Sequence, residues 1–69
     1  MQVYLFLADG FEEIEAISPI DILRRANINI QTVSISGTKE VTGTHGIIIQ
    51  ADLLFTEVDF SLNDMLILP

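Results

Sequence analysis

Three glutamates within four residues, in the stretch GFEEIEAISP, are the side chains most suggestive of chemistry. Glu12 and Glu13 begin a run of helical length, where the positive end of a helix dipole favours carboxylates by about 0.3–1 kcal/mol. That structural role is sufficient for both. Glu15 falls between Phe11 and Ile22 on a helical wheel, in the middle of an apolar arc. A carboxylate buried there requires a hydrogen bond or a proton, so Glu15 is a candidate acid.

Pro19 lies four residues after Glu15 and lacks the N–H that would bond the Glu15 carbonyl. The helix is therefore predicted either to kink there or to begin again, with Ser18 as N-cap and Pro19 at the first position. If the helix begins irregularly, the phase of the wheel slips and Glu15 becomes exposed. The residues alone leave both placements of Glu15 open.

The other titratable side chains carry weaker signals. His45 lies in a glycine-flanked bend and is interpreted as a turn or surface histidine. Asp9, Asp21 and Asp52 are interpreted as turn, helix-face and strand-end carboxylates, and no pair of them has the neighbours of a metal site. The chain has no cysteine, which excludes a disulfide and a thiolate metal site within it. We expect neither a metal nor a cofactor.

Composition limits the possible partners. The formal charge is −7 with only three basic residues, which argues against nucleic acid and against an anionic membrane surface. No segment approaches the roughly 20 apolar residues of a membrane span. The first residues lack the basic start and cleavage site of a signal peptide, so a cytoplasmic location is expected.

Hydrophobic periodicity divides the chain into a short series of elements. Gln2–Ala8 is a nearly continuous apolar run typical of a buried strand, and Asp64–Leu68 is another. Between them the pattern predicts a helix, an alternating strand and a glycine-bent hairpin, at Phe11–Ala26, Asn29–Ser36 and Val41–Ile49. Ala51–Asp59 is ambiguous.

The order strand, helix, strand, hairpin, strand predicts an α/β fold with a parallel sheet. One helix cannot cover both faces of such a sheet, and 49% of the residues are hydrophobic, a high share for so small an interior. We therefore expect residues 1–69 to be the N-terminal portion of a single domain, completed by chain that is not part of this sequence. The helix at 11–26 is apolar nearly all round, which favours a subunit interface on its outer side.

The stretch LADGFEEIEAISPIDILRRANI resembles the first strand–helix unit of the ThiJ/PfpI family, which includes the parkinsonism-associated protein. VTGTHGIIIQAD and the terminal DMLILP are also similar to that family, so the resemblance extends over essentially all 69 residues. One difference is Asn27, where the family commonly has glycine. Asparagine is the next choice for a left-handed residue that ends a helix.

The resemblance implies a flavodoxin-like, doubly wound and mostly parallel sheet with helices on both faces, related to class I glutamine amidotransferases. It also implies a homodimer and a reactive cysteine downstream of this segment. Glu15 matches the family acid whose protonated carboxyl hydrogen-bonds that cysteine and tunes its thiolate. Arg25 matches a basic, substrate-binding residue near the pocket in some members. A solvated or inter-subunit charge, favoured at a helix C-terminus, is the simpler role for Arg25.

Three functional hypotheses follow. The resemblance implies a cysteine-dependent hydrolase, glyoxalase or deglycase acting on small carbonyl compounds or peptides, or an enzyme of thiazole monophosphate (thiamine) biosynthesis. The alternative is a non-catalytic dimeric chaperone or redox-sensing module of the same fold. A phosphoreceiver-like or nucleotide-binding fragment is disfavoured, because Asp9 has no partner acid beside it and no GxGxxG or P-loop pattern is present.

Overall fold

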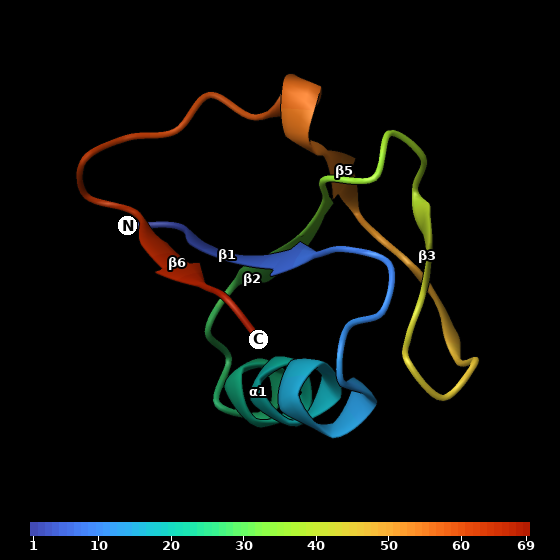
Figure 1. Ribbon diagram of the computed structural model, residues 1–69. Helices are drawn as coiled ribbons and strands as arrows, with labels where there is room; N and C mark the ends of the chain where they lie inside the picture. Colours follow the sequence, from blue (N-terminus) through green and yellow to red (C-terminus); the bar gives the residue numbers. More distant parts are fainter.

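The computed structural model describes residues 1–69 and has a four-stranded sheet, one α-helix and a separate hairpin (Figure 1). The elements in chain order are β1 (Val3–Leu7), α1 (Glu13–Arg25), β2 (Ile30–Ser34), β3 (Glu40–Thr42), β4 (Ile48–Gln50), β5 (Leu53–Leu54), the 3-10 helix η1 (Phe55–Glu57) and β6 (Met65–Ile67). Its one α-helix is too short and too polar to cross a membrane.

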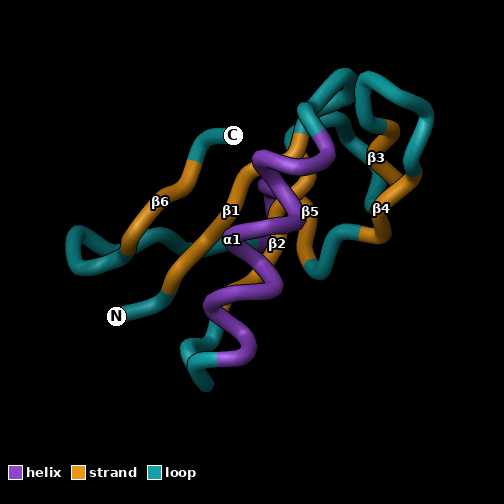
Figure 2. Tube along the Cα trace, turned by 90° about the horizontal axis from the view of Figure 1, so that it is seen from below, coloured by secondary structure: helices purple, strands orange, loops and turns teal.

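All four strands of the main sheet are parallel, in the order β5-β2-β1-β6. β1 pairs with β2 from Val3–Ile30 through Leu7–Ser34, and α1 connects the two across one face of the sheet (Figure 2). The chain later returns to add β6 on the other side of β1. The predicted α/β class with a parallel sheet is confirmed.

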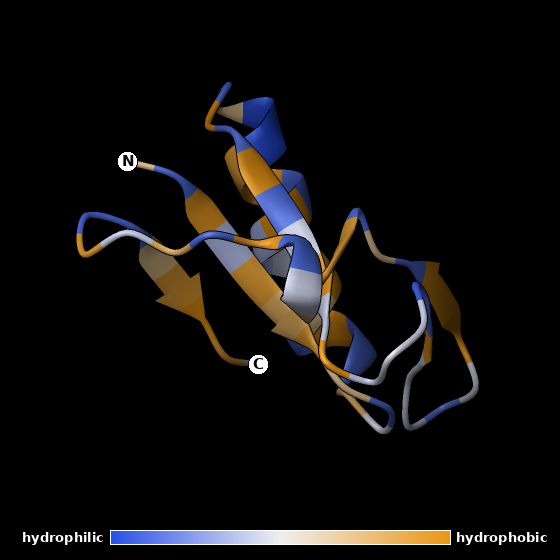
Figure 3. Ribbon diagram, turned by 90° about the horizontal axis from the view of Figure 1, so that it is seen from above, coloured by the Kyte–Doolittle hydropathy of each residue, from blue (hydrophilic) through white to orange (hydrophobic).

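Side-chain alternation along β1 gives each face of the sheet its own apolar cluster. Leu5 and Leu7 are fully buried and belong to the core that includes Ala16 of α1. Tyr4 and Phe6 have the opposite parity in the strand, and their rings lie 5.2 and 5.6 Å from that of Phe60. The segment after β5 thus runs over the face opposite α1, as Figure 3 shows.

The β3–β4 hairpin lies beyond the main sheet and is bound to the loop after β1. Gly10 N donates to Thr42 O at 2.8 Å, and Thr44 N donates to Phe11 O at 2.8 Å. The Thr42 amide also donates to Asp9 Oδ1 at 3.1 Å. The hairpin predicted within Val41–Ile49 is present, and these bonds dock it against the start of α1.

The helix is continuous from Glu13 to Arg25 with Pro19 inside it, so the predicted alternative of a restart at Ser18 is wrong. It also starts two residues later than predicted, because the Phe11 carbonyl accepts from the Thr44 amide of the hairpin, and the first helical bond runs from the Ala16 amide to Glu12 O. At the other end, Asn27 has a φ of 61°, the left-handed conformation expected of an asparagine that ends a helix.

Glu15 is exposed within this chain, which is one of the two placements that the residues alone left open. The wheel treated Phe11 as helical and took its direction for the buried side, but Phe11 precedes the helix. The face of α1 that packs on the sheet carries Ala16, with Ile20 and Leu23 partly buried beside it. Glu15 lies about 100° from Ala16, on the outer side of the helix.

Candidate functional site

A hollow of about 260 Å³ lies at the carboxyl ends of β1 and β6. It is lined by Phe6, Ala8, Asp9, Gly10, Phe11, Ile35, Leu68 and Pro69. From β1 the chain goes to β2 on one side and returns to β6 on the other, so the strand order reverses at this point. In open parallel sheets, ligands bind in the crevice at such a reversal, beyond the carboxyl ends of the strands. This hollow is therefore the candidate site.

The loop that lines the hollow leads directly into the acidic first turn of α1. Glu12 is the N-cap residue, and its Oε1 accepts a long hydrogen bond of 3.4 Å from the Ile14 amide. Glu13 follows and is buried. Glu15 points to the outer side of the helix and takes part in none of the chain's side-chain hydrogen bonds or ion pairs, unlike its two neighbours. Of the three acids, Glu15 alone is free to meet a group from outside this chain.

Glu13 holds the tip of the β3–β4 hairpin through both of its carboxylate oxygens. Its Oε2 accepts from the amides of His45 at 2.8 Å and Ile47 at 3.3 Å. Its Oε1 lies 2.9 Å from His45 Nδ1. The carboxylate also packs directly on the backbone of Gly43, where a Cβ would overlap it. The result is a carboxylate–histidine contact that joins two segments 32 residues apart in sequence.

These contacts change the protonation behaviour of both partners. Burial alone would raise the pKa of Glu13, but the hydrogen bonds from the His45 ring, the His45 amide and the Ile47 amide lower that pKa to about 2. The pKa of His45 is raised above its ordinary value, first by the hydrogen bond to Glu13 and then by the negative charges of Glu13 and Glu12. Each partner therefore favours the charged form of the other, the carboxylate of Glu13 and the protonated ring of His45.

Glu12, Glu13 and His45 together bring three potential ligand atoms within 4.8 Å of one another, the one such group of acids and histidine in the chain. These residues could ligate a cation. However, both oxygens of Glu13 already accept hydrogen bonds from the protein.

The sequence analysis missed this contact. His45 does lie in a turn and its side chain is 68% exposed, as expected of a turn histidine. Its ring is nevertheless bound to Glu13, for which the sequence predicted only a favourable interaction with the helix dipole. A usable signal was Gly43, which is buried but has no positive φ and so serves close approach rather than a special backbone conformation.

Arg25 lies ten residues beyond Glu15, roughly 15 Å farther along the helix axis. Its Nε donates to Asp21 Oδ1 at 3.1 Å in an exposed i,i+4 pair. The structure does not bring Arg25 to the hollow of its own chain. Its expected substrate-binding role stays a prediction that would require another copy or another segment.

The three aspartates have the local roles predicted for them. Asp9 lies in the turn after β1, and Asp21 lies on α1. Asp52 immediately precedes β5, where its Oδ2 accepts from the Thr32 amide at 2.9 Å and from Arg24 at 3.1 Å.

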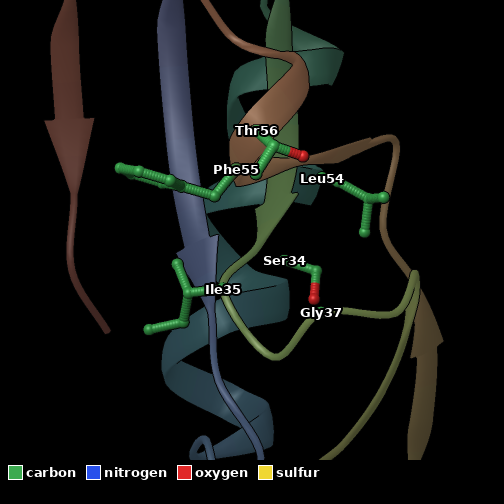
Figure 4. Close-up of a pocket in the computed structure, with 6 residues that line it drawn as sticks. All are labelled: Ser34, Ile35, Gly37, Leu54, Phe55 and Thr56. Carbon is green, nitrogen blue, oxygen red and sulfur yellow. The ribbon is translucent and has the colours of Figure 1, made fainter.

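A second, larger hollow of about 520 Å³ lies beside the ends of β2 and β5 (Figure 4). It is lined by Ser34, Ile35, Gly37, Leu54, Phe55 and Thr56. Its one buried polar side chain is already occupied, because Ser34 Oγ donates to Thr38 O and accepts from the Ser36 amide at 3.2 Å. This hollow offers apolar surface and two hydroxyl groups but no ionisable side chain, so it is not the candidate site.

Comparison with known proteins agrees with this geometry. The model of the DJ-1/PfpI family matches residues 1–69, the whole of the chain. The chain belongs to the DJ-1/PfpI family. The resemblance inferred from the LADGFEEIEAISP stretch is thereby confirmed.

Curated relatives show how much of a DJ-1/PfpI protein this chain represents. A deglycase from Thermococcus kodakarensis is 38% identical over 69 residues, which are 100% of this chain and 41% of that protein. The DJ-1 homolog B of Arabidopsis thaliana is 34% identical over 68 residues, 99% of this chain and 16% of that protein. The chain thus spans less than half the length of these relatives.

Solved structures of the family contain the same arrangement. A DJ-1 superfamily protein from Salmonella typhimurium, crystallised with one cysteine replaced by alanine, matches with a TM-score of 0.78 at 41% identity. The match covers 81% of this chain and 30% of that one. Oxidised DJ-1 of Toxoplasma gondii matches with a TM-score of 0.80 at 38% identity, over 83% of this chain and 31% of that one. The flavodoxin-like α/β fold is thereby confirmed for the segment.

Proposed function

We propose that this chain supplies the acidic part of a cysteine-dependent site that acts on small carbonyl compounds, with deglycase or glyoxalase chemistry. The observation that carries the proposal is the hollow at the strand-order reversal, which is followed directly by α1 with Glu15 unpartnered. A deglycase among the relatives supports the reaction class. The chain has no cysteine, so the thiol has to come from another part of the protein.

Glu15 has the position required of a residue that meets a group from outside the chain. It lies on the first turn of α1, exposed, while Glu12 and Glu13 are engaged locally. Covering Glu15 with protein would favour its neutral form, because burial disfavours a carboxylate. A neutral carboxyl donates a hydrogen bond, stabilises an adjacent thiolate and can transfer a proton to a carbonyl oxygen.

The test is steady-state kinetics on the longest natural polypeptide that contains these residues, with a neutral α-oxoaldehyde as substrate. Glu15→Gln is expected to lower kcat/KM at least 100-fold, because general acid–base assistance contributes about 10²–10⁴-fold. Glu40→Gln is the matched control, since Glu40 is exposed on β3 and does not line the hollow. Turnover that survives Glu15→Gln as well as Glu40→Gln would refute the role of Glu15.

A non-catalytic chaperone or redox-sensing role is the second candidate, favoured by the apolar surface of the chain. Ile14 is 74% exposed and Ile22 is 63% exposed, both on the outer side of α1. If the polypeptide suppresses aggregation of a heated client protein and turns over no carbonyl substrate, this second function replaces the first.

We further propose that the outer face of α1 contacts a second copy of the protein, and that the protein acts in the cytoplasm. The exposed isoleucines on that face support the contact, since large exposed apolar patches mark interfaces. Ile22→Glu is expected to shift a dimer to monomer in sedimentation velocity. An unchanged sedimentation coefficient would exclude this face.

A phosphorylated thiazole is a further substrate class expected from the family resemblance.

A further inference from the structure

The unit β1–loop–α1 is the place where a parallel α/β sheet would ordinarily bind an anion. Backbone N–H groups of the first loop and the helix N-terminus point toward ligands at such sites, and phosphates and carboxylates are held there. A phosphorylated or carboxylated substrate would therefore be expected in the hollow, unless the chain itself opposes it.

Four amides between Asp9 and Ile14 already donate to acceptors within the chain. The Asp9 amide donates to Ser36 Oγ at 3.3 Å, and the Gly10 amide donates to Thr42 O at 2.8 Å. The Phe11 amide donates to Ala8 O at 3.0 Å. At the helix start, the Ile14 amide donates to Glu12. An anion in the hollow would find these donors bound to protein acceptors.

The charges around the hollow have the wrong sign for an anion. Asp9 lines the hollow with an exposed carboxylate, held in place by the Thr42 amide on its Oδ1. Three further glutamates follow within six residues. His45 is the one cationic candidate beside these glutamates, and its ring is bound to Glu13.

The basic side chains lie elsewhere. None of them lines the hollow. Arg24 pairs with Asp52 at 3.1 Å, Arg25 pairs with Asp21 at 3.1 Å, and Lys39 lies 3.9 Å from Glu57. Both arginines belong to the last turn of α1, at the opposite end of the helix from the loop that lines the hollow.

We infer that Asp9 is a specificity-determining residue that excludes anions, so that the site takes neutral or cationic carbonyl compounds and rejects phosphorylated or carboxylated ones. The inference rests on the proposed function and narrows it. It disfavours a phosphorylated thiazole as substrate, because the one charged side chain of this chain that lines the hollow is a carboxylate and none of its basic side chains lines it. The negative charge of Asp9 repels an anionic substrate from the hollow, and this repulsion is strongest at low ionic strength.

The experiment compares a neutral α-oxoaldehyde with an α-oxoaldehyde of similar length that ends in a carboxylic acid, so that both compounds carry the same reacting aldehyde. It uses the longest natural polypeptide that contains these residues. The wild-type protein is expected to prefer the neutral compound. Asp9→Asn keeps the Oδ1 acceptor for Thr42 and removes the charge, so the fold should persist. Asp9→Asn is expected to raise kcat/KM for the acid, relative to kcat/KM for the neutral compound, by roughly three- to tenfold at low salt. Asp9→Lys is expected to raise this ratio further.

Two controls make the result specific. Asp59→Asn removes one negative charge from an exposed position that does not line the hollow, and it is expected to leave the ratio unchanged. Raising the salt to about 0.5 M is expected to shrink the Asp9 effect by screening. As a second readout, the alkylation rates of the reactive thiol with iodoacetamide and with iodoacetate should show the same change in ratio.

The outcomes separate the inference from the function on which it rests. If the wild-type protein converts the neutral α-oxoaldehyde but neither Asp9 variant changes the ratio, the inference is wrong and the proposed function stands. If the protein converts neither compound and has no reactive thiol, the proposed function fails and the inference falls with it. A wild-type preference for the acid would overturn the inference directly.

Discussion

Replacing Gly43 with alanine is expected to damage the docking of the β3–β4 hairpin, by an amount that depends on Glu13. Gly43 has no positive φ, so its backbone conformation accepts alanine. A Cβ at this position would lie 2.5 Å from Glu13 Cδ and 2.9 Å from Glu13 Cγ. Both distances are far shorter than van der Waals contact, so the side chain or the hairpin has to move. Overpacking of this kind typically costs about 1–3 kcal/mol.

The sign of the effect should reverse when the glutamate is removed. In a Glu13→Ala background the added methyl group meets no carboxylate. Gly43→Ala is then expected to be neutral or to stabilise by about 0.4–1 kcal/mol, because alanine restricts the unfolded chain. The two backgrounds should therefore differ by about 1–4 kcal/mol in the effect of one methyl group.

The assay is urea unfolding followed by far-ultraviolet circular dichroism for the four members of the double-mutant cycle. Gly46→Ala is the matched control, because Gly46 has a φ of 85° and its added Cβ would meet nothing within 4 Å. That change should destabilise equally in both backgrounds through backbone strain. An equal effect of Gly43→Ala with and without Glu13 would refute the packing argument.

Two further predictions follow from the polar contacts. The folded pKa of His45 lies above 6.5 and that of Glu13 is about 2 rather than 4.5. The contribution of His45 to the free energy of unfolding is therefore complete below pH 6.5 and is lost as pH rises through its folded pKa. The contribution of Glu13 is present above pH 4.5 and is lost as pH falls toward 2. The protection factors of the His45 and Ile47 amides, which are exchange rates corrected for the intrinsic rate at each pH, should be largest between about pH 4.5 and 6.5. An NMR titration of Glu13→Gln should return the His45 pKa toward 6.5; protection factors that do not vary with pH, or an unchanged titration, would contradict this. Asp52→Ala should destabilise the protein by about 1–3 kcal/mol in urea unfolding, since it removes the acceptor of the buried Thr32 amide, and an unchanged midpoint would show that water replaces it.

The layout of the fold could be predicted because its signals are local. The apolar run containing Val3–Leu7 and the alternation ending at Ser34 fall on observed strands, and the glycine-bent hairpin lies where expected. Asn27 ends the helix in a left-handed conformation because few other residue types accept it. In each case the residue types within one short window determine the backbone.

The contacts of Glu13 could not be predicted from the sequence, because they join the start of α1 to a hairpin 32 residues away in the chain. Glu13 meets His45 only after α1 has packed on the sheet and the hairpin has folded back over the loop. The placement of Glu15 within this chain could not be decided from the wheel, because the helix is apolar nearly all round and the wheel does not tell which arc packs on the sheet. Phe11, which suggested burial of the arc beside Glu15, lies in the loop, and Ile22 on that arc is 63% exposed.

The proposed function depends most directly on Glu15, on the first turn of α1. The quantity to measure first is therefore the effect of Glu15 on the pKa of the reactive thiol. The measurement is the alkylation rate of the reactive cysteine with iodoacetamide as a function of pH, in the longest natural polypeptide that contains these residues. If Glu15 donates a hydrogen bond to the thiolate, Glu15→Gln should raise the midpoint of that profile by roughly one pH unit or more, while Glu40→Gln leaves it unchanged. The same midpoint in all three proteins would show that Glu15 does not act on the cysteine.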